Sequence, residues 1–147
     1  MEATSMCVVY KATEVRKNWS EFVDSAERVR PGFIQKTRDR YTLISDEMML
    51  SLLSMSEFTA QEYAEDDGSV TLSLNEIDLA ANAPNLPEAR VALGNDILEY
   101  AEEYYSDFQR YSHSPNRSGH FPYVMKALMI GDGKKIGEEL ECQAGKN

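Results

Sequence analysis

The stretch that decides the fold is Ala12-Thr13-Glu14-Val15-Arg16-Lys17-Asn18-Trp19-Ser20-Glu21-Phe22-Val23-Asp24. A short apolar run, Cys7-Val8-Val9-Tyr10, precedes it and predicts a β-strand over residues 6–10. Behind Thr13, apolar residues recur at helical spacing, which predicts a helix capped by the Thr13 hydroxyl and ended by Pro31-Gly32. The apolar stripe of this helix comprises Val15, Trp19, Phe22, Val23, Ala26 and Val29.

Two short strands and a second helix are predicted to follow. The strands lie over residues 33–37 and 41–45 and are joined through Arg38-Asp39-Arg40. A run rich in Met and Leu then predicts a helix over residues 46–58. Strand, helix, hairpin and helix together make up a first predicted domain, residues 1–58.

This order of elements resembles the Phd/YefM family of antitoxins, the repressors of type II toxin–antitoxin operons. Residues 12–24 carry the resemblance: an alanine, a Ser/Thr cap, Glu-x-Arg, and then Asn, an aromatic residue and Ser. Lys36-Thr37-Arg38 and Ser45-Asp46-Glu47 also fit, and the resemblance covers about the first 55 residues. One departure is visible, because the family's longer Arg-x-Gly-Lys-Pro type of turn is replaced by the shorter Arg38-Asp39-Arg40.

The resemblance implies a dimer whose paired N-terminal halves present the first helix and the hairpin to operator DNA. The DNA-binding residues that it implies are Thr13, Arg16, Lys17 and Arg38. Their charge adds Lys36 and Arg40 to the set. The chemistry is suitable, because free amides at a helix start bind phosphate and arginine forks onto phosphate or guanine.

Charge is distributed unevenly along the chain. Residues 1–45 hold 8 Lys/Arg and 6 Asp/Glu, a net of +2, whereas residues 46–147 hold 7 and 19, a net of −12; the sum is −10. Local phosphate neutralisation, not total charge, decides DNA affinity, so the acidic whole chain does not exclude a DNA-binding half. The alternative is that Arg16 and Arg38 are solvated charges that pair with neighbouring carboxylates.

The second half completes a predicted α+β fold. Residues 59–69 are acidic and contain a glycine, which predicts a linker and the domain boundary. A smaller module of strands and helices, residues 70–147, is expected to follow. Its predicted strands cover residues 70–74 and 77–81, and its predicted helices cover residues 87–111, 120–130 and 134–141.

The acidic module is predicted to bind the cognate toxin, which we expect to be a basic, RelE-like RNase because opposite charge steers association. A carboxylate face on the long helix consists of Asp96, Glu99, Glu103 and Asp107. The predicted toxin-binding residues are Glu99, Glu103, Tyr105 and Asp107. The other aromatic side chains of this helix are expected in the core, with Tyr105 exposed.

Two other functions remain open from the sequence. The first is a free-standing DNA-binding regulator whose C-terminal module senses a small ligand or assembles oligomers. Asn116, Arg117 and His120 form a loop beside the aromatic helix that is compatible with a small-ligand or toxin contact, although a capped turn between helices is the favoured interpretation. The second is an enzyme that uses the carboxylate face to hold a metal.

The sequence predicts a protein that is not an enzyme and has no catalytic residue, metal or cofactor. It contains no phosphate-binding glycine loop and no nucleophile–histidine signature. Its two cysteines, Cys7 and Cys142, match no disulfide framework or zinc spacing. Without a membrane span or signal-peptide core, a cytoplasmic homodimer or higher homo-oligomer is expected.

Overall fold

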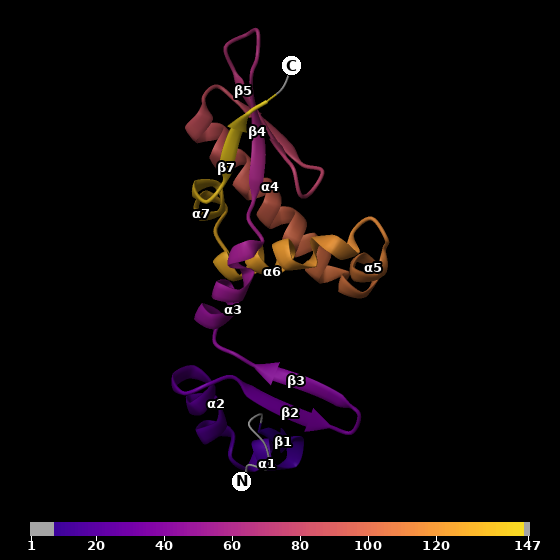
Figure 1. Ribbon diagram of the computed structural model, residues 1–147. Coiled ribbons are helices and arrows are strands. Elements are labelled where there is room, and N and C mark those ends of the chain that lie inside the picture. The colour runs from indigo at the N-terminus through magenta and orange to yellow at the C-terminus, as the bar shows by residue number, and fades with distance from the viewer. Residues whose placement is uncertain (1–7, 146–147) are drawn as a thin grey trace. The chain divides into compact units, whose positions relative to one another are not determined.

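The computed structural model describes residues 8–145, and the chain divides into two compact units, Met1–Leu52 and Leu53–Asn147 (Figure 1). Part of the predicted first strand, including Cys7, lies outside the described residues. Each unit contains one sheet and several helices, which confirms the predicted α+β class. The second unit is the larger, whereas the sequence analysis describes a smaller module.

The first unit is built on a three-stranded sheet in the order β1-β2-β3. β2 pairs with β1 in parallel and with β3 in antiparallel orientation. The parallel pair requires a crossover, which the helical segment between β1 and β2 provides. The elements are β1 (Val9–Lys11), α1 (Ala12–Lys17), α2 (Trp19–Arg28), β2 (Gly32–Lys36), β3 (Asp39–Leu43) and α3 (Asp46–Leu52).

The single helix predicted behind Thr13 is in fact two helices that meet at Asn18. This residue leaves the helical region, with φ −118° and ψ 37°. Its backbone N–H and its side-chain Nδ2 both donate to the Glu14 carbonyl at 3.1 Å. The break changes the rotational phase of the apolar positions, so Trp19 is 55% exposed and Val29 is 70% exposed. Their predicted place in the buried stripe is therefore wrong, while Val15, Phe22 and Ala26 are buried as predicted.

Thr13 does not cap the first helix, so this prediction is also wrong. Lys11 precedes the first helical residue, with an extended φ of −69° and ψ of 143°, and no side chain caps this end. The reason is the sheet: Lys11 pairs with Gln35, so β1 continues until it enters α1 at Ala12. Thr13 lies inside the first turn and is exposed.

The hairpin is tighter than predicted. Lys36 and Asp39 are the last paired residues, which leaves Thr37 and Arg38 as the turn. Thr37 takes a positive φ of 57°. Because Asp39 and Arg40 belong to β3, the predicted turn Arg38-Asp39-Arg40 is wrong. The helix predicted over residues 46–58 ends at Leu52, and the short 3₁₀ helix η1 (Leu53–Met55) begins the second unit.

The second unit contains a four-stranded sheet in the order β6-β5-β4-β7. Its strands are β4 (Thr59–Ala64), β5 (Val70–Leu74), β6 (Ala80–Ala83) and β7 (Glu141–Ala144). The linker predicted over residues 59–69 is wrong, because β4 pairs with strands on both sides and only the acidic residues after it form a turn. Ala60 is fully buried and Glu62 is partly exposed, so one acidic side chain does not prevent strand formation.

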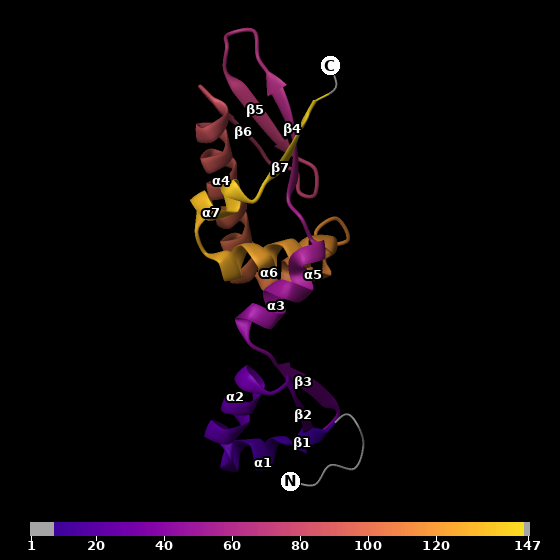
Figure 2. The ribbon, with the colours of Figure 1, turned by 60° about the vertical axis from the view of Figure 1, so that its left-hand side comes forward.

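Helices cover this sheet. They are α4 (Leu86–Ser106), α5 (Phe108–His113), the 3₁₀ helix η2 (Ser118–His120), α6 (Phe121–Ile130) and α7 (Gly133–Glu138). α4 lies against β5 and β6, and α7 packs beside α4 (Figure 2). Asn85 caps α4, since its side chain accepts from the Glu88 amide at 3.0 Å. The long helix predicted to reach residue 111 ends at Ser106. The strand predicted over residues 77–81 starts later than expected, at Ala80.

α4 and α7 approach so closely that backbone touches backbone. A β-carbon on Gly94 would stand 1.9 Å from the carbonyl oxygen of Gly133. Arg90 on α4 also holds the end of α7, since its Nη1 donates to the carbonyls of Gly137 at 3.2 Å and Leu140 at 2.8 Å. Together these contacts place β7, which follows α7, at the edge of the sheet beside β4. No helix within residues 8–145 is both long and apolar enough to cross a membrane.

Candidate functional site

Two surfaces carry the residues singled out by the sequence. The first, here called the basic edge, is the end of the first unit formed by α1 and the β2–β3 hairpin. Its residues are Thr13, Arg16 and Lys17 on α1, and Lys36, Arg38 and Arg40 on the hairpin. All six side chains are exposed. The predicted candidates are therefore accessible to a partner.

Strand register brings the start of α1 beside the hairpin. Lys11 at the end of β1 lies opposite Gln35, and Gln35 lies opposite Arg40. The Gln35 side chain donates to the Thr37 carbonyl at 2.9 Å and so fixes the turn. Lys11 is a cation that the sequence analysis does not single out, because only the pairing of β1 with β2 places it in this row.

The two faces of the sheet separate the two candidates that lie on its strands, Lys36 and Arg40. Tyr10 faces α2, where its ring meets Phe22 edge to face at a centroid distance of 5.9 Å. Side chains alternate along a strand, so Lys36 shares this helix-covered face and Arg40 lies on the opposite one. Arg40 accordingly lies 5.9 Å from the ring centroid of Phe33. Lys36 and Arg40 thus lie on opposite faces of the same end of the hairpin. On α1, Arg16 and Lys17 follow about 6 Å along the helix axis from its first residue, Ala12.

These cations are not neutralised within the described chain. Among residues 8–145, the ion pairs join only side chains of the second unit. Lys36 and Asp39 lie opposite each other in the hairpin, yet they form no ion pair within 4.0 Å. The alternative in which Arg16 and Arg38 pair with neighbouring carboxylates therefore finds no support in the geometry.

Arg16 also borders an apolar groove. The groove has a volume of about 330 Å³ and is lined by Ala12, Val15, Trp19 and Ile34 besides Arg16. Trp19 is 55% exposed, an unusual position for the one tryptophan of the chain. Sequence reasoning missed this groove because it assigned Trp19 to the buried stripe.

The second surface, here called the acidic surface, comprises the predicted toxin-binding residues Glu99, Glu103, Tyr105 and Asp107. The first three lie on α4, and all four are exposed. Tyr105 is 67% exposed, as predicted, whereas its neighbour Tyr104 is fully buried and donates to the Arg117 carbonyl at 3.1 Å. The carboxylates of Glu99 and Glu103 share one face of α4, whereas the free ring of Tyr105, two residues after Glu103, lies on a different face.

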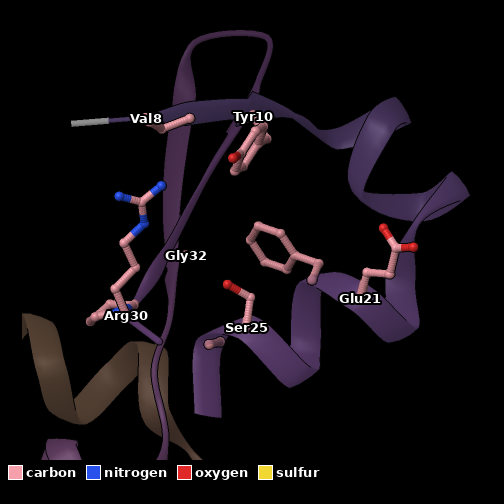
Figure 3. Close-up of a pocket in the computed structure, with 9 residues that line it drawn as sticks. Val8, Tyr10, Glu21, Ser25, Arg30 and Gly32 are labelled. Atoms are coloured by element: carbon pink, nitrogen blue, oxygen red, sulfur yellow. The ribbon is translucent and has the colours of Figure 1, made fainter. Parts of the chain in front are cut away.

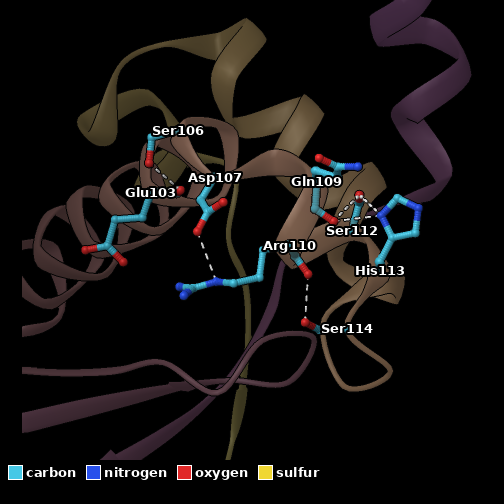
Figure 4. Close-up of polar contacts among 8 residues, drawn as sticks. All are labelled: Glu103, Ser106, Asp107, Gln109, Arg110, Ser112, His113 and Ser114. Atoms are coloured by element: carbon cyan, nitrogen blue, oxygen red, sulfur yellow. Dashed lines mark hydrogen bonds and ion pairs between the residues drawn. The ribbon is translucent and has the colours of Figure 1, made fainter.

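Asp107 departs from this arrangement. α4 ends at Ser106, and Asp107 adopts a non-helical φ of −132° and ψ of 50°. Its carboxylate forms an ion pair with Arg110, at 3.0 Å from Nε (Figure 4). The predicted continuous carboxylate face thus stops at Glu103, and the charge of Asp107 is already paired within the chain.

Asp96, at the other end of this face, is partly buried. Burial raises the pKa of its carboxyl, and the nearby charge of Glu99 raises it further. Across residues 8–145, no three His, Cys, Asp or Glu side chains gather in a group that could hold a metal ion. The carboxylates of α4 are therefore a charged face and do not converge on a metal site.

Two further exposed aromatic rings form a pair that the sequence did not indicate. Phe108 and Phe121 are 37% and 41% exposed, and their centroids lie 5.5 Å apart in an edge-to-face pair. They belong to α5 and α6, which follow different loops, so only the fold brings them together. Tyr104 supports Phe108 from the core at a centroid distance of 5.7 Å.

Comparisons with known proteins agree with this architecture. Residues 6–142 match the family model described as "Antitoxin of toxin-antitoxin, RelE / RelB, TA system". A crystal structure from Syntrophomonas wolfei subsp. wolfei, described as an antitoxin part of a candidate toxin/antitoxin system, is similar to this chain with a TM-score of 0.86 and 27% sequence identity. The similarity covers 94% of this chain and 99% of that chain. No curated protein matches the sequence.

Proposed function

The chain belongs to the family of antitoxins of RelE/RelB toxin–antitoxin systems, and from this membership we propose that it has two activities. It neutralises a basic, RelE-like RNase toxin by direct binding through its second unit. It represses its own operon by binding operator DNA through its first unit, in the manner of the Phd/YefM antitoxins that residues 12–24 resemble. On this proposal it is a regulatory protein of the cytoplasm, where both partners are found, and not an enzyme.

One observation carries the DNA-binding part of the proposal. The cations of the basic edge are exposed and free of ion pairs within residues 8–145, although the whole chain has a net charge of −10. An isolated set of unpaired cations on an acidic protein concentrates positive charge where phosphate can be neutralised. Arg38 in the turn and Lys36 and Arg40 beside it form a narrow projection, which suits insertion along a DNA groove.

A homodimer follows from the same proposal. A dimer duplicates the basic edge and matches the two half-sites of a palindromic operator. Exposed apolar side chains in the first unit, Trp19 and Tyr41 at 55% and 51% exposure, favour self-association over a solitary monomer.

Charge and aromatic exposure support toxin binding by the second unit. The second unit, residues 53–147, holds 7 Lys/Arg and 17 Asp/Glu, a net charge of −10 that accelerates encounter with a basic protein. Tyr105 provides an exposed aromatic anchor on the same helix as the carboxylates of Glu99 and Glu103, on a different face. Tyrosine is among the residues that most often dominate binding energy at protein interfaces.

Co-expression with the protein encoded by the neighbouring reading frame tests this function. The expected result is that the neighbouring protein alone arrests growth, that the chain restores growth, and that the two co-purify. Replacing Glu99 and Glu103 by Gln should weaken co-purification. The matched control replaces Glu65 and Asp66, two exposed carboxyl groups of the β4–β5 turn, by Gln and Asn. Equal loss with both pairs would contradict a specific role for the acidic surface.

A further inference from the structure

The second unit contains a cavity that shares only Glu103 with the surfaces proposed to bind DNA and toxin. It has a volume of about 510 Å³, in the range typical of small-molecule sites. Its apolar part comes from Ile77 and Leu79, which lie in the loop between β5 and β6, and from the ring of Tyr111 on α5. Asp78, Tyr100, Glu103, Asn116, Arg117 and His120 supply its polar groups.

Arg117 is the most informative of these groups. Its guanidinium carbon lies 4.5 Å from the ring centroid of Tyr111, so the side chain is held by a cation–π contact. It is partly buried, and within residues 8–145 it has neither an ion-pair partner nor a side-chain hydrogen bond. A partly buried, oriented guanidinium with all its N–H groups unused is suited to a carboxylate.

Tyr100 and His120, which also line the cavity, form a hydrogen-bonded pair. Tyr100 Oη and His120 Nδ1 lie 2.6 Å apart. Burial lowers the pKa of His120 and the Arg117 charge lowers it further, while burial raises the pKa of Tyr100. Both shifts favour the uncharged forms of the two side chains, so neither adds a charge to the cavity. Arg117 is then the positive charge of the cavity.

Carboxylates supply the other sign of charge. Asp78 and Glu103 line the same cavity and are both exposed. Their charges repel a ligand that is only anionic, and Arg117 repels one that is only cationic. We propose that this cavity binds a small zwitterion of the α-amino-acid class, with its carboxylate on Arg117, its ammonium towards Asp78 and Glu103, and its side chain on Ile77 and Leu79. Apart from Glu103, which also belongs to the acidic surface, the residues of this site take no part in the proposed DNA and toxin functions.

Titration of the isotope-labelled full chain with each free L-amino acid, followed by NMR, tests the proposal. We expect an amino acid with an apolar side chain to give saturable shifts at the amides of Tyr111, Arg117 and His120. The matching amine and the matching deaminated acid should each bind at least about tenfold more weakly, because each loses one charge-assisted contact. Absence of saturable shifts across the whole panel, or an amine that binds as tightly as its amino acid, would overturn the proposal.

The chain offers a matched control for the variant. Arg110 lies over the same Tyr111 ring at 5.2 Å but is paired with Asp107 and does not line the cavity. Arg117→Met should weaken binding about tenfold or more, whereas Arg110→Met should leave it within about twofold. Asp78→Asn, an exposed substitution, should also weaken binding and tests the ammonium position even if Arg117→Met fails to fold. Unchanged affinity in folded Arg117→Met, or in Asp78→Asn, would refute the assignment.

Discussion

The ring of Phe22 lies against Gly32 so closely that a β-carbon on the glycine would stand 2.3 Å from Phe22 Cζ. Both residues line a small cavity of the first unit, where Gly32 is labelled in Figure 3. Phe22 is only 4% exposed and its ring also contacts Tyr10. The absence of a side chain at the first residue of β2 is therefore what allows α2 to pack on the sheet.

Replacement of Gly32 by Ala should destabilise the first unit. The added methyl group overlaps a buried aromatic ring, and overpacking of this kind costs about 1–3 kcal/mol. Denaturant unfolding followed by the fluorescence of Trp19, which lies in the first unit, measures the loss. Gly119→Ala serves as control, because a β-carbon there meets nothing within 4 Å. Equal midpoints for the two variants would contradict the close packing of Phe22 on Gly32.

Replacement of Gly94 by Ala should destabilise the second unit by at least as much. Its β-carbon would meet the Gly133 carbonyl at 1.9 Å, and a backbone atom cannot move aside as a flexible side chain can. We expect a loss of about 3 kcal/mol, at the upper end of overpacking costs. Thermal unfolding followed by far-ultraviolet circular dichroism measures it. A melting curve that matches wild type would show that α4 and α7 do not touch at this glycine.

Acidification below about pH 6.5 should weaken the second unit through His120. Its pKa in the folded chain lies below the ordinary value of 6.5, so the unfolded chain binds the proton more readily. Stability is then fully present above that ordinary value and falls as the pH drops towards the lower folded pKa. His120→Gln, which can still accept from Tyr100, should remove this part of the pH dependence.

The exposed His113 provides the control for that experiment. His113→Gln should retain the wild-type fall in unfolding free energy between about pH 7 and pH 5. Urea titrations at several pH values separate the two variants. The same slope in His120→Gln and in wild type would show that His120 is not the responsible group.

Sequence patterns located most elements of this fold because local signals dominate them. Alternation and helical spacing are properties of neighbouring residues, so the hairpin, the helix begun at Asn85 and the exposed Tyr105 follow from them. The break at Asn18 could not be predicted from spacing, because a helix often tolerates an asparagine. Here the asparagine side chain hydrogen-bonds to the Glu14 carbonyl and competes with the helix.

Features that depend on residues distant in the sequence could not be predicted from local patterns. β4 looked like part of a linker because Glu62 and the acidic residues of the following turn make residues 59–69 acidic, and only pairing with β5 and β7 makes it a strand. The same reason applies to the sites. Arg117 is placed over Tyr111, and Lys11 beside the hairpin, by tertiary packing and strand register that no local pattern encodes.

The central claim, that the basic edge binds operator DNA, is tested most directly by titrating DNA from the chain's own promoter region at several salt concentrations. Arg16→Ala and Arg38→Ala should each weaken binding, and each should lower the slope of log affinity against log salt by about one phosphate contact. Arg28→Ala, an exposed cation on α2 at the end of the unit remote from the hairpin turn, should leave both quantities unchanged. Folded Arg16 and Arg38 variants with the affinity and salt slope of wild type would contradict the account.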